Sequence, residues 1–214
     1  MADLIRHRTG YMSDTHDPFV LAKQVKEDLE EYDCKTDEPL WFDTIVGTGM
    51  SGCLALPVIA RELEVNFYAV RKPNDGSHST YPGEGILGER ILFFDDFIDT
   101  GSTLYRILDV IKGVVRKQNR YNRIYEQNKV QFVGAYLYSA YDKKVLDVKG
   151  LESYMAHRLG SDAVAGFKSA IKSFNEGQVF DYEEEERKRE EILNGIVCKS
   201  DDSSGLRGKA TVEW

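Results

Sequence analysis

Cysteine is scarce in this sequence of 214 residues, which contains only Cys34, Cys53 and Cys198. The odd number and the wide spacing argue against a disulfide framework and indicate a reducing compartment. Because no two cysteines form a Cys-x-x-Cys pair, a zinc site of the finger type is not expected. We therefore expect three free thiols.

Long hydrophobic runs are also missing. No apolar stretch approaches the roughly 20 residues that a helix needs to cross a bilayer. The first 14 residues are polar and charged, without the apolar segment of a secretory signal. We expect a cytoplasmic protein that has no membrane partner.

Positive charge is in deficit, with 28 Lys and Arg residues against 36 Asp and Glu residues and a net charge of −8. This balance argues against a nucleic-acid partner, which requires a basic face. The acidity is local. Residues 26–38 hold seven acidic and two basic side chains, and residues 181–191 hold seven acidic and three basic side chains. The rest of the chain is close to neutral, so a small anion site remains compatible with it.

Continuous apolar runs alternate with helical patterns along most of the chain. The expected strands cover residues 44–46, 65–70, 90–94 and 130–138. The expected helices cover residues 18–32, the stretches after Gly52 and Gly101, and residues 164–174, followed by a charged helical stretch at 181–191. This alternation predicts an α/β fold with a mostly parallel, twisted sheet flanked by helices. Residues 71–88 have no apolar period and predict a long loop.

The first glycine motif, Gly47-x-Gly49-x-x-Gly52, follows a strand and opens a helix. This context is typical of the dinucleotide fingerprint of a Rossmann unit, which also needs an acidic residue at the end of the second strand. That strand ends in Arg71-Lys72 instead, which would suit the 2′-phosphate of NADP. A tight turn with a purely structural role is the other interpretation.

The second motif is longer and more specific. Four apolar residues, 91–94, place Asp95 and Asp96 at the carboxyl end of a buried strand, which is the edge of an α/β sheet where ligands bind. Two adjacent carboxylates there need a sugar diol or a magnesium ion to meet them. The following Thr100-Gly101-Ser102-Thr103 combines hydroxyl groups with a helix N-terminus, which predicts a phosphate cradle. A capping turn beside a solvated strand end is the structural alternative.

The segment FFDDFIDTGST, residues 93–103, resembles the motif with which type I phosphoribosyltransferases bind phosphoribosyl pyrophosphate (PRPP). Residues 46–49 resemble the pyrophosphate loop of that family, Arg71-Lys72 its basic pair, and residues 73–88 its mobile catalytic loop. The resemblance covers roughly residues 42–140. It implies a phosphoribosyltransferase core at 42–145, an N-terminal helix or hood element at 1–41, and a helical C-terminal extension with a tail at 146–214.

The resemblance also implies roles for the matching residues. Gly47, Thr48, Gly49, Arg71 and Lys72 would bind pyrophosphate. Asp95 and Asp96 would grip the ribose, stabilise positive charge on its ring and hold Mg²⁺, largely through PRPP and water. Asp99, Thr100, Gly101, Ser102 and Thr103 would bind the 5′-phosphate.

Asp99 precedes the Thr-Gly pair, as in the members of this family that use 6-oxopurines. This resemblance favours the transfer of a phosphoribosyl group from PRPP to hypoxanthine, guanine or xanthine, with Asp99 holding the N7 proton of the purine. Adenine or orotate as the base, a PRPP-binding regulatory protein without turnover, and an NADP oxidoreductase are the alternatives. Lys143, Lys144, Tyr136, Tyr138 and Tyr141 are candidates for contact with the base. Members of the family are commonly homodimers, so a dimer is expected.

Overall fold

A computed structural model describes residues 17–72, 81–122, 127–139 and 144–200 of the chain. The side chains of residues 122 and 193–200 are not described. The chain divides into two compact units, residues 1–179 and residues 180–214. The predicted divisions after residues 41 and 145 concern function and stay predictions.

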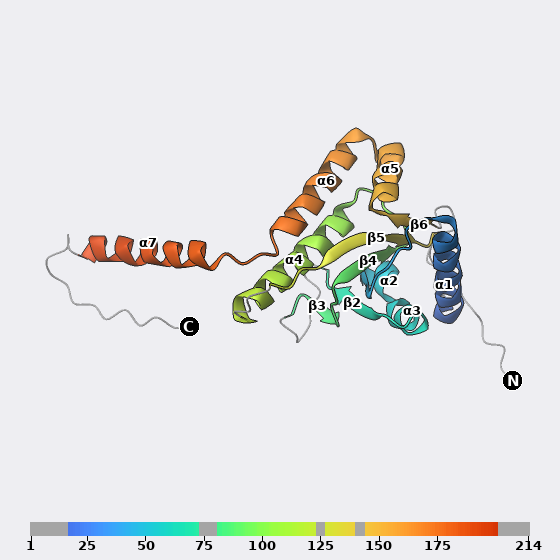
Figure 1. The fold of residues 1–214 in the computed structure, drawn as a ribbon, viewed down its shortest axis with the longest axis horizontal. Helices are drawn as coiled ribbons and strands as arrows, with labels where there is room; N and C mark the ends of the chain where they lie inside the picture. Colours follow the sequence, from blue (N-terminus) through green and yellow to red (C-terminus); the bar gives the residue numbers. More distant parts are fainter. Residues whose placement is uncertain (1–16, 73–80, 123–126, 140–143, 201–214) are drawn as a thin grey trace, which may run out of the picture. The chain divides into compact units, whose positions relative to one another are not determined.

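The first unit is built on one six-stranded sheet (Figure 1). Its strands are β1 (Thr44–Thr48), β2 (Asn66–Val70), β3 (Gly83–Gly85), β4 (Arg90–Asp95), β5 (Gln131–Leu137) and β6 (Lys144–Asp147). In space they follow the order β3-β2-β1-β4-β5-β6. The four central strands are parallel, whereas β3 and β6 pair antiparallel at the two edges. The predicted α/β fold with a mostly parallel sheet is therefore confirmed.

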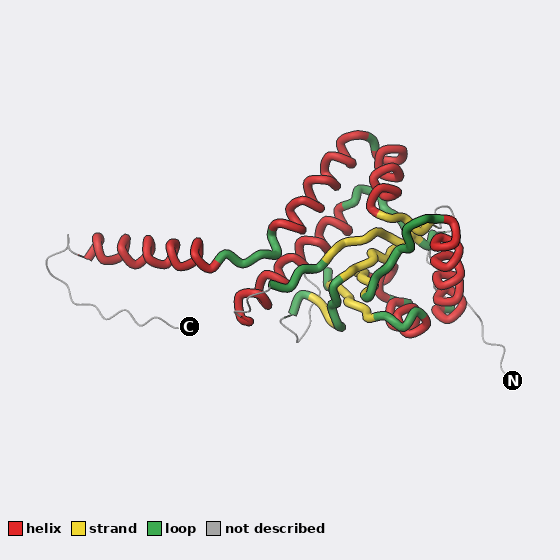
Figure 2. Tube along the Cα trace, in the orientation of Figure 1, coloured by secondary structure: helices red, strands yellow, loops and turns green. Residues whose placement is uncertain are grey.

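Helices cover both faces of this sheet (Figure 2). They are α1 (Pro18–Lys35), α2 (Gly49–Cys53), α3 (Leu56–Glu62), α4 (Ser102–Asn122), α5 (Val148–Leu159) and α6 (Ser161–Glu176). Apolar side chains of α4, α5 and α6 form one core with Ile91 and Phe93 of β4. Those of α1 and α3 form the other core with Leu92 and Phe94. Successive side chains of β4 thus point to opposite faces, as the pleat of a strand requires.

The start of α1 follows from its sequence. Asp17 is the N-cap, and its Oδ1 accepts hydrogen bonds from the backbone N–H groups of Phe19 at 3.1 Å and Val20 at 3.2 Å. Pro18 occupies the first helical position, where its missing N–H costs nothing. The predicted helix is confirmed at its start, and it continues to Lys35 rather than ending at residue 32.

Three details differ from the sequence-based expectation. The stretch after Gly52 forms two short helices, α2 and α3, instead of one. The segment 71–88, expected to be a loop throughout, contains the three-residue strand β3. The strand β6 was not expected. Both missed strands are short and lie at the edges of the sheet, where they lack the continuous apolar run of a central strand.

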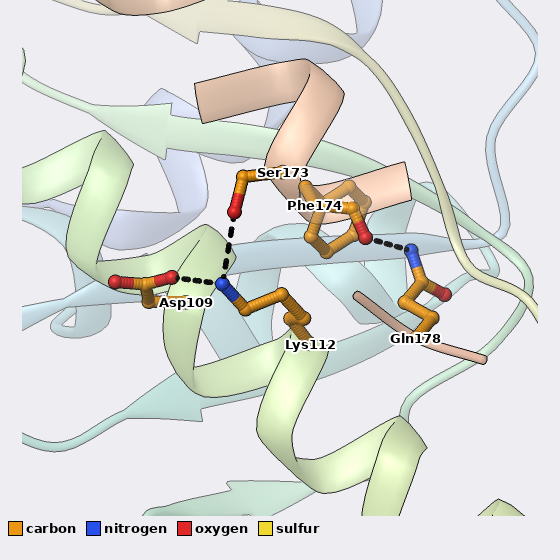
Figure 3. Close-up of polar contacts among 5 residues, drawn as sticks. All are labelled: Asp109, Lys112, Ser173, Phe174 and Gln178. Carbon is orange, nitrogen blue, oxygen red and sulfur yellow. Dashed lines mark hydrogen bonds and ion pairs between the residues drawn. The ribbon is translucent and has the colours of Figure 1, made fainter. Parts of the chain in front are cut away.

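Polar contacts fasten α6 and the segment after it to α4 and the rest of the unit (Figure 3). The ammonium of Lys112 lies 2.6 Å from Asp109 Oδ1 and donates to Ser173 Oγ at 3.2 Å. The side-chain amide of Gln178 donates to the backbone carbonyls of Phe174 at 3.1 Å and Val130 at 2.9 Å. Because Gln178 is almost completely buried, these two hydrogen bonds satisfy a polar group that would otherwise be costly.

The second unit contains helix α7 (Tyr182–Ser200), which includes the predicted charged stretch. Ion pairs one turn apart join Lys188 to Glu184 at 2.6 Å and Arg187 to Glu191 at 3.9 Å. Such exposed pairs contribute only a few tenths of a kcal/mol each. Within the described parts of the chain, no helix combines the length and the apolar character needed to cross a membrane.

Candidate ligand-binding site

A cavity of about 270 Å³ lies at the carboxyl end of β4, beside the first turn of α4. It is lined by Ser51, Lys72, Phe93, Asp95, Asp96, Phe97, Ile98, Asp99, Thr100, Gly101, Ser102, Thr103 and Leu104. The position follows from the topology, because β1 and β4 are adjacent parallel strands whose carboxyl ends meet at one edge of the sheet.

Two carboxylates form the floor of this cavity. Asp95 and Asp96 are only 5% and 8% exposed, respectively. Asp95 Oδ1 accepts the backbone N–H of Asp96 at 3.0 Å, and Asp96 Oδ1 accepts that of Phe97 at 3.0 Å. Asp96 Oδ2 is buried and has no hydrogen-bond partner among the described residues. An unpaired buried carboxylate oxygen is costly, so it favours a ligand that brings a hydroxyl donor or a cation.

The environment of Asp95 opposes its ionisation. Burial raises the pKa of Asp95 to about 7, although a hydrogen bond from Ser51 and the backbone N–H of Asp96 lower it in part. The neighbouring charge of Asp96 raises it further. A donor or a cation in the cavity would therefore favour the carboxylate form of Asp95.

The loop after Asp99 carries hydroxyl groups to the start of α4. Thr100 Oγ1 donates to Ser102 Oγ at 2.9 Å and accepts the backbone N–H of Ser102 at 3.3 Å. Gly101 has φ +79°, and a Cβ there would lie 2.9 Å from the side chains of Met155 and Tyr105. Thr100 and Ser102 are exposed, so their hydroxyls are accessible at the mouth of the cavity, next to the positive end of the α4 dipole.

The first glycine motif forms a turn in which its outer glycines touch. A Cβ on Gly47 would lie 2.0 Å from the backbone oxygen of Gly52. Gly49 has φ +66°, and a Cβ there would lie 2.5 Å from Cε of Lys72. The motif thus allows the close approach of two backbone segments at Gly47 and Gly52, and of the Lys72 side chain at Gly49.

We expect Gly47→Ala to destabilise the protein strongly, by about 3 kcal/mol or more, because its methyl group collides with backbone rather than with a movable side chain. Urea denaturation followed by circular dichroism measures the change. Gly113→Ala is the matched control, since nothing lies within 4 Å of a Cβ at that helical position. Equal stability of the two variants would contradict the close contact at Gly47.

The structure gathers most of the predicted site residues around one cavity. Lys72, Asp95, Asp96, Asp99, Thr100, Gly101, Ser102 and Thr103 all line it. Gly47, Thr48 and Gly49 are not among the lining residues, but Lys72 connects the turn to the cavity by packing against Gly49. Arg71 does not line the cavity either, and its guanidinium forms an ion pair with Glu84 of β3.

The candidates for contact with a base are less well supported. Tyr136 and Tyr138 are buried in the core, where their hydroxyls donate to Asp28 at 2.6 Å and to the backbone oxygen of Ser51 at 2.9 Å, so neither can stack on a ligand. The ammonium of Lys144 lies 5.1 Å from the ring centre of Tyr154. The remaining candidates, Lys143 and Tyr141, and most of the expected catalytic loop, residues 73–80, lie outside the described residues.

Two residues near the site were missed by sequence reasoning. Ser51 lines the cavity and bonds to Asp95, although it occupies one of the unspecified positions of the glycine motif. Arg106 of α4 donates from Nη2 to Thr48 Oγ1 at 3.0 Å. It lies on the polar face of α4, opposite the apolar stripe, so nothing in the sequence distinguishes it from the other charged residues of that helix.

The described cysteines and potential metal ligands also bear on the chemistry of this site. Cys34 and Cys53 are free thiols, as expected, and burial raises the pKa of Cys53 to about 11, so Cys53 does not supply a thiolate. No group of three or more potential metal-binding side chains occurs among the residues that the structure describes. The adjacent, buried side chains of Asp95 and Asp96 nevertheless offer carboxylate oxygens, the ligand type that Mg²⁺ prefers.

No family model and no curated protein matches this chain in sequence. Solved structures similar to it include adenine phosphoribosyltransferase from Saccharomyces cerevisiae, with 24% identity over 55% of this chain and 68% of that one, at a TM-score of 0.35. Orotate phosphoribosyltransferase from Mycobacterium tuberculosis has 13% identity over 56% of each chain, at a TM-score of 0.34. Adenine phosphoribosyltransferase from Trypanosoma brucei, in complex with AMP, pyrophosphate and ribose-5-phosphate, has 16% identity over 74% of this chain and 62% of that one, at a TM-score of 0.40. These matches span 56% to 68% of the other chains.

Proposed function

We propose that this protein is a phosphoribosyltransferase that transfers the 5-phosphoribosyl group from PRPP to a nitrogen atom of a nucleobase and releases pyrophosphate. One observation carries the proposal. Asp96, whose buried Oδ2 has no hydrogen-bond partner among the described residues, lines the same cavity as the hydroxyl-rich first turn of α4. In a sugar diol joined to a phosphate group, the diol can donate to the carboxylate and the phosphate can bind at the hydroxyl-rich helix start.

Each part of PRPP has candidate residues in this arrangement. Asp95 and Asp96 accept hydrogen bonds from the ribose hydroxyls. Residues 99–103 hold the 5′-phosphate with their hydroxyls and with the backbone N–H groups at the start of α4. Residues 47–49 and Lys72 hold the pyrophosphate, with Arg71 as a further contributor once its side chain leaves Glu84.

The chemistry is a substitution at C1 of the ribose. The bond between C1 and the pyrophosphate oxygen breaks, its electron pair leaves with pyrophosphate, and a ring nitrogen of the base bonds to C1. Positive charge develops on the sugar ring during this step, and the carboxylates of Asp95 and Asp96 stabilise it. The cation Lys72 compensates the charge that appears on the leaving group. Residues 73–88 are proposed to exclude water that would otherwise hydrolyse PRPP.

For the base we propose a 6-oxopurine. Asp99 is exposed at the mouth of the cavity, where its carboxylate can accept the proton from N7 of a purine that approaches C1. Adenine and orotate are the alternative bases. A regulatory protein that binds PRPP without turnover is the alternative function. A homodimer and a cytoplasmic location remain part of this proposal.

Mg²⁺ is the cofactor that fits the residues present. Asp95 and Asp96 would hold it together with PRPP and water, and it would neutralise phosphate charge. The donor set supports this, because Asp95 and Asp96 are adjacent carboxylates and Asp96 keeps one buried oxygen unused by the described residues.

The test is pyrophosphate release by purified protein with PRPP, Mg²⁺ and a panel of bases: hypoxanthine, guanine, xanthine, adenine, orotate and uracil. We expect release with at least one 6-oxopurine. Release with adenine or orotate alone would reject the 6-oxopurine assignment. Calorimetric binding of PRPP without any release would favour the regulatory protein, and no binding of PRPP would reject the proposal. Binding of NADP instead would favour the oxidoreductase.

A further inference from the structure

Arg106 makes an interior polar contact that none of the roles above uses. It lies on α4, and its Nη2 donates to Thr48 Oγ1 at 3.0 Å. Its Nε is buried and has no hydrogen-bond partner in the described part of the chain. A guanidinium with a buried, unsatisfied nitrogen is costly for stability, so a purely structural role explains its presence poorly.

The partner of Arg106 lies at the point where β1 changes into a turn. Thr48 is 2% exposed and extended, at φ −149° and ψ 154°, and Gly49 follows at φ +66°. A threonine that precedes a helix usually accepts a backbone N–H of the first turn with its own oxygen. Thr48 makes no such capping bond. Its side chain is held by Arg106 instead.

This contact joins the two loops that surround the cavity. Ser102 and Thr103, at the start of α4, line the cavity, and Arg106 lies one turn further along the same helix. Thr48 belongs to the glycine turn, which Lys72 contacts at Gly49. One helix therefore carries the hydroxyl loop at its start and bonds to the glycine turn through Arg106, so this bond contributes to the spacing between the two loops.

We propose that Arg106 is a positioning residue that holds the turn 47–49 in the conformation that receives a diphosphate group. A loop held in its binding conformation loses less conformational entropy when the ligand binds, and so binds more tightly. The charge of Arg106 acts in the same direction, because a diphosphate bound at the turn brings negative charge towards a half-buried guanidinium whose Nε has no partner among the described residues. The inference rests on the proposed function, since it assumes that a diphosphate binds at this turn.

The test is a double-mutant cycle on the dissociation constant of pyrophosphate, measured by calorimetry in the presence of Mg²⁺. Arg106→Met removes the charge and the donor, and Thr48→Val removes the acceptor at nearly constant shape. We expect each change to weaken binding about tenfold or more, the usual effect of a lost hydrogen bond to a charged group. The double variant should bind no more weakly than Arg106→Met alone, because both changes break the same contact.

Several controls make the outcome specific. Arg116→Met removes an exposed arginine from the same helix and should leave the dissociation constant unchanged. Thr48→Ser keeps the hydroxyl and should bind more tightly than Thr48→Val. If Arg106→Met fails to fold by circular dichroism, Arg106→Lys replaces it in the cycle. Additive effects of the two single variants, or unchanged binding in both, would overturn the positioning role. If the wild-type protein binds neither pyrophosphate nor PRPP, the proposed function fails as well.

Discussion

Replacing Asp96 by asparagine is expected to lower kcat/KM for PRPP by roughly 10²–10³-fold, the usual loss when one preorganised electrostatic group is removed from an active site. The buried Oδ2 of Asp96 has no partner among the described residues, and under the proposed function it accepts a hydrogen bond from the ribose. Asparagine keeps the shape but replaces that oxygen, or its neighbour, by an amide N–H₂. The variant can neither accept a ribose hydroxyl fully nor stabilise positive charge on the ring. Steady-state pyrophosphate release measures the loss.

The control for this experiment is Asp162→Asn, which removes an exposed carboxylate from α6. It should leave kcat/KM unchanged. Because asparagine preserves the volume of the side chain, Asp96→Asn should also retain the circular dichroism of the wild type. Turnover of Asp96→Asn within about threefold of the wild type, well short of the loss expected for such a group, would remove this carboxylate from the catalytic step.

Asp95→Asn is expected to make the unliganded protein more stable at pH 8, by about 2 kcal/mol. Burial raises the pKa of Asp95 from 3.8 to about 7, which corresponds to a cost of at most roughly 4 kcal/mol for the ionised form. At a pH between these two pKa values, Asp95 is mostly protonated in the folded state and mostly ionised in the unfolded state, so the folded state binds more protons. Stability from this group is therefore full below pH 3.8 and is lost as the pH rises towards and through 7. Asparagine removes that cost but retains only part of the hydrogen bonding.

Urea denaturation at pH 5 and at pH 8, in the presence of a chelator, measures this effect. The difference in the free energy of unfolding between Asp95→Asn and the wild type should grow with pH, while that of Asp162→Asn should stay constant. The pH-dependent difference therefore reports the ionisation of Asp95 together with its interaction with Asp96. A wild type that is more stable than Asp95→Asn by the same amount at both values would contradict the raised pKa.

The centre of the fold and half of the site are predictable because local sequence determines them. Residues 91–94 are apolar without interruption, a run that is typical of a strand buried on both faces. The end of that strand, the acidic pair after it and the hydroxyl loop follow within ten residues. Their mutual position is therefore set by the local geometry of a strand, a loop and a helix, which a sequence shows directly.

The contacts between distant segments are not predictable in this way. Arg106 and Thr48 are separated by 58 residues, and nothing in either stretch specifies the other. Ser51 meets Asp95 only because β1 and β4 are neighbours in the sheet. Arg71, by contrast, was expected at the site from its place after β2. It points to Glu84 because the antiparallel strand β3, which the sequence did not indicate, lies beside it.

The two antiparallel edge strands also bear on how copies of this protein can associate. β3 has three residues and directly follows Pro82, and β6 has four, so neither offers a long row of free backbone groups to a second sheet. Short edges of this kind disfavour the joining of sheets between molecules and the aggregation that such joining promotes. If two copies associate, as proposed, we expect them to do so through helices or loops rather than through a continuous intermolecular sheet.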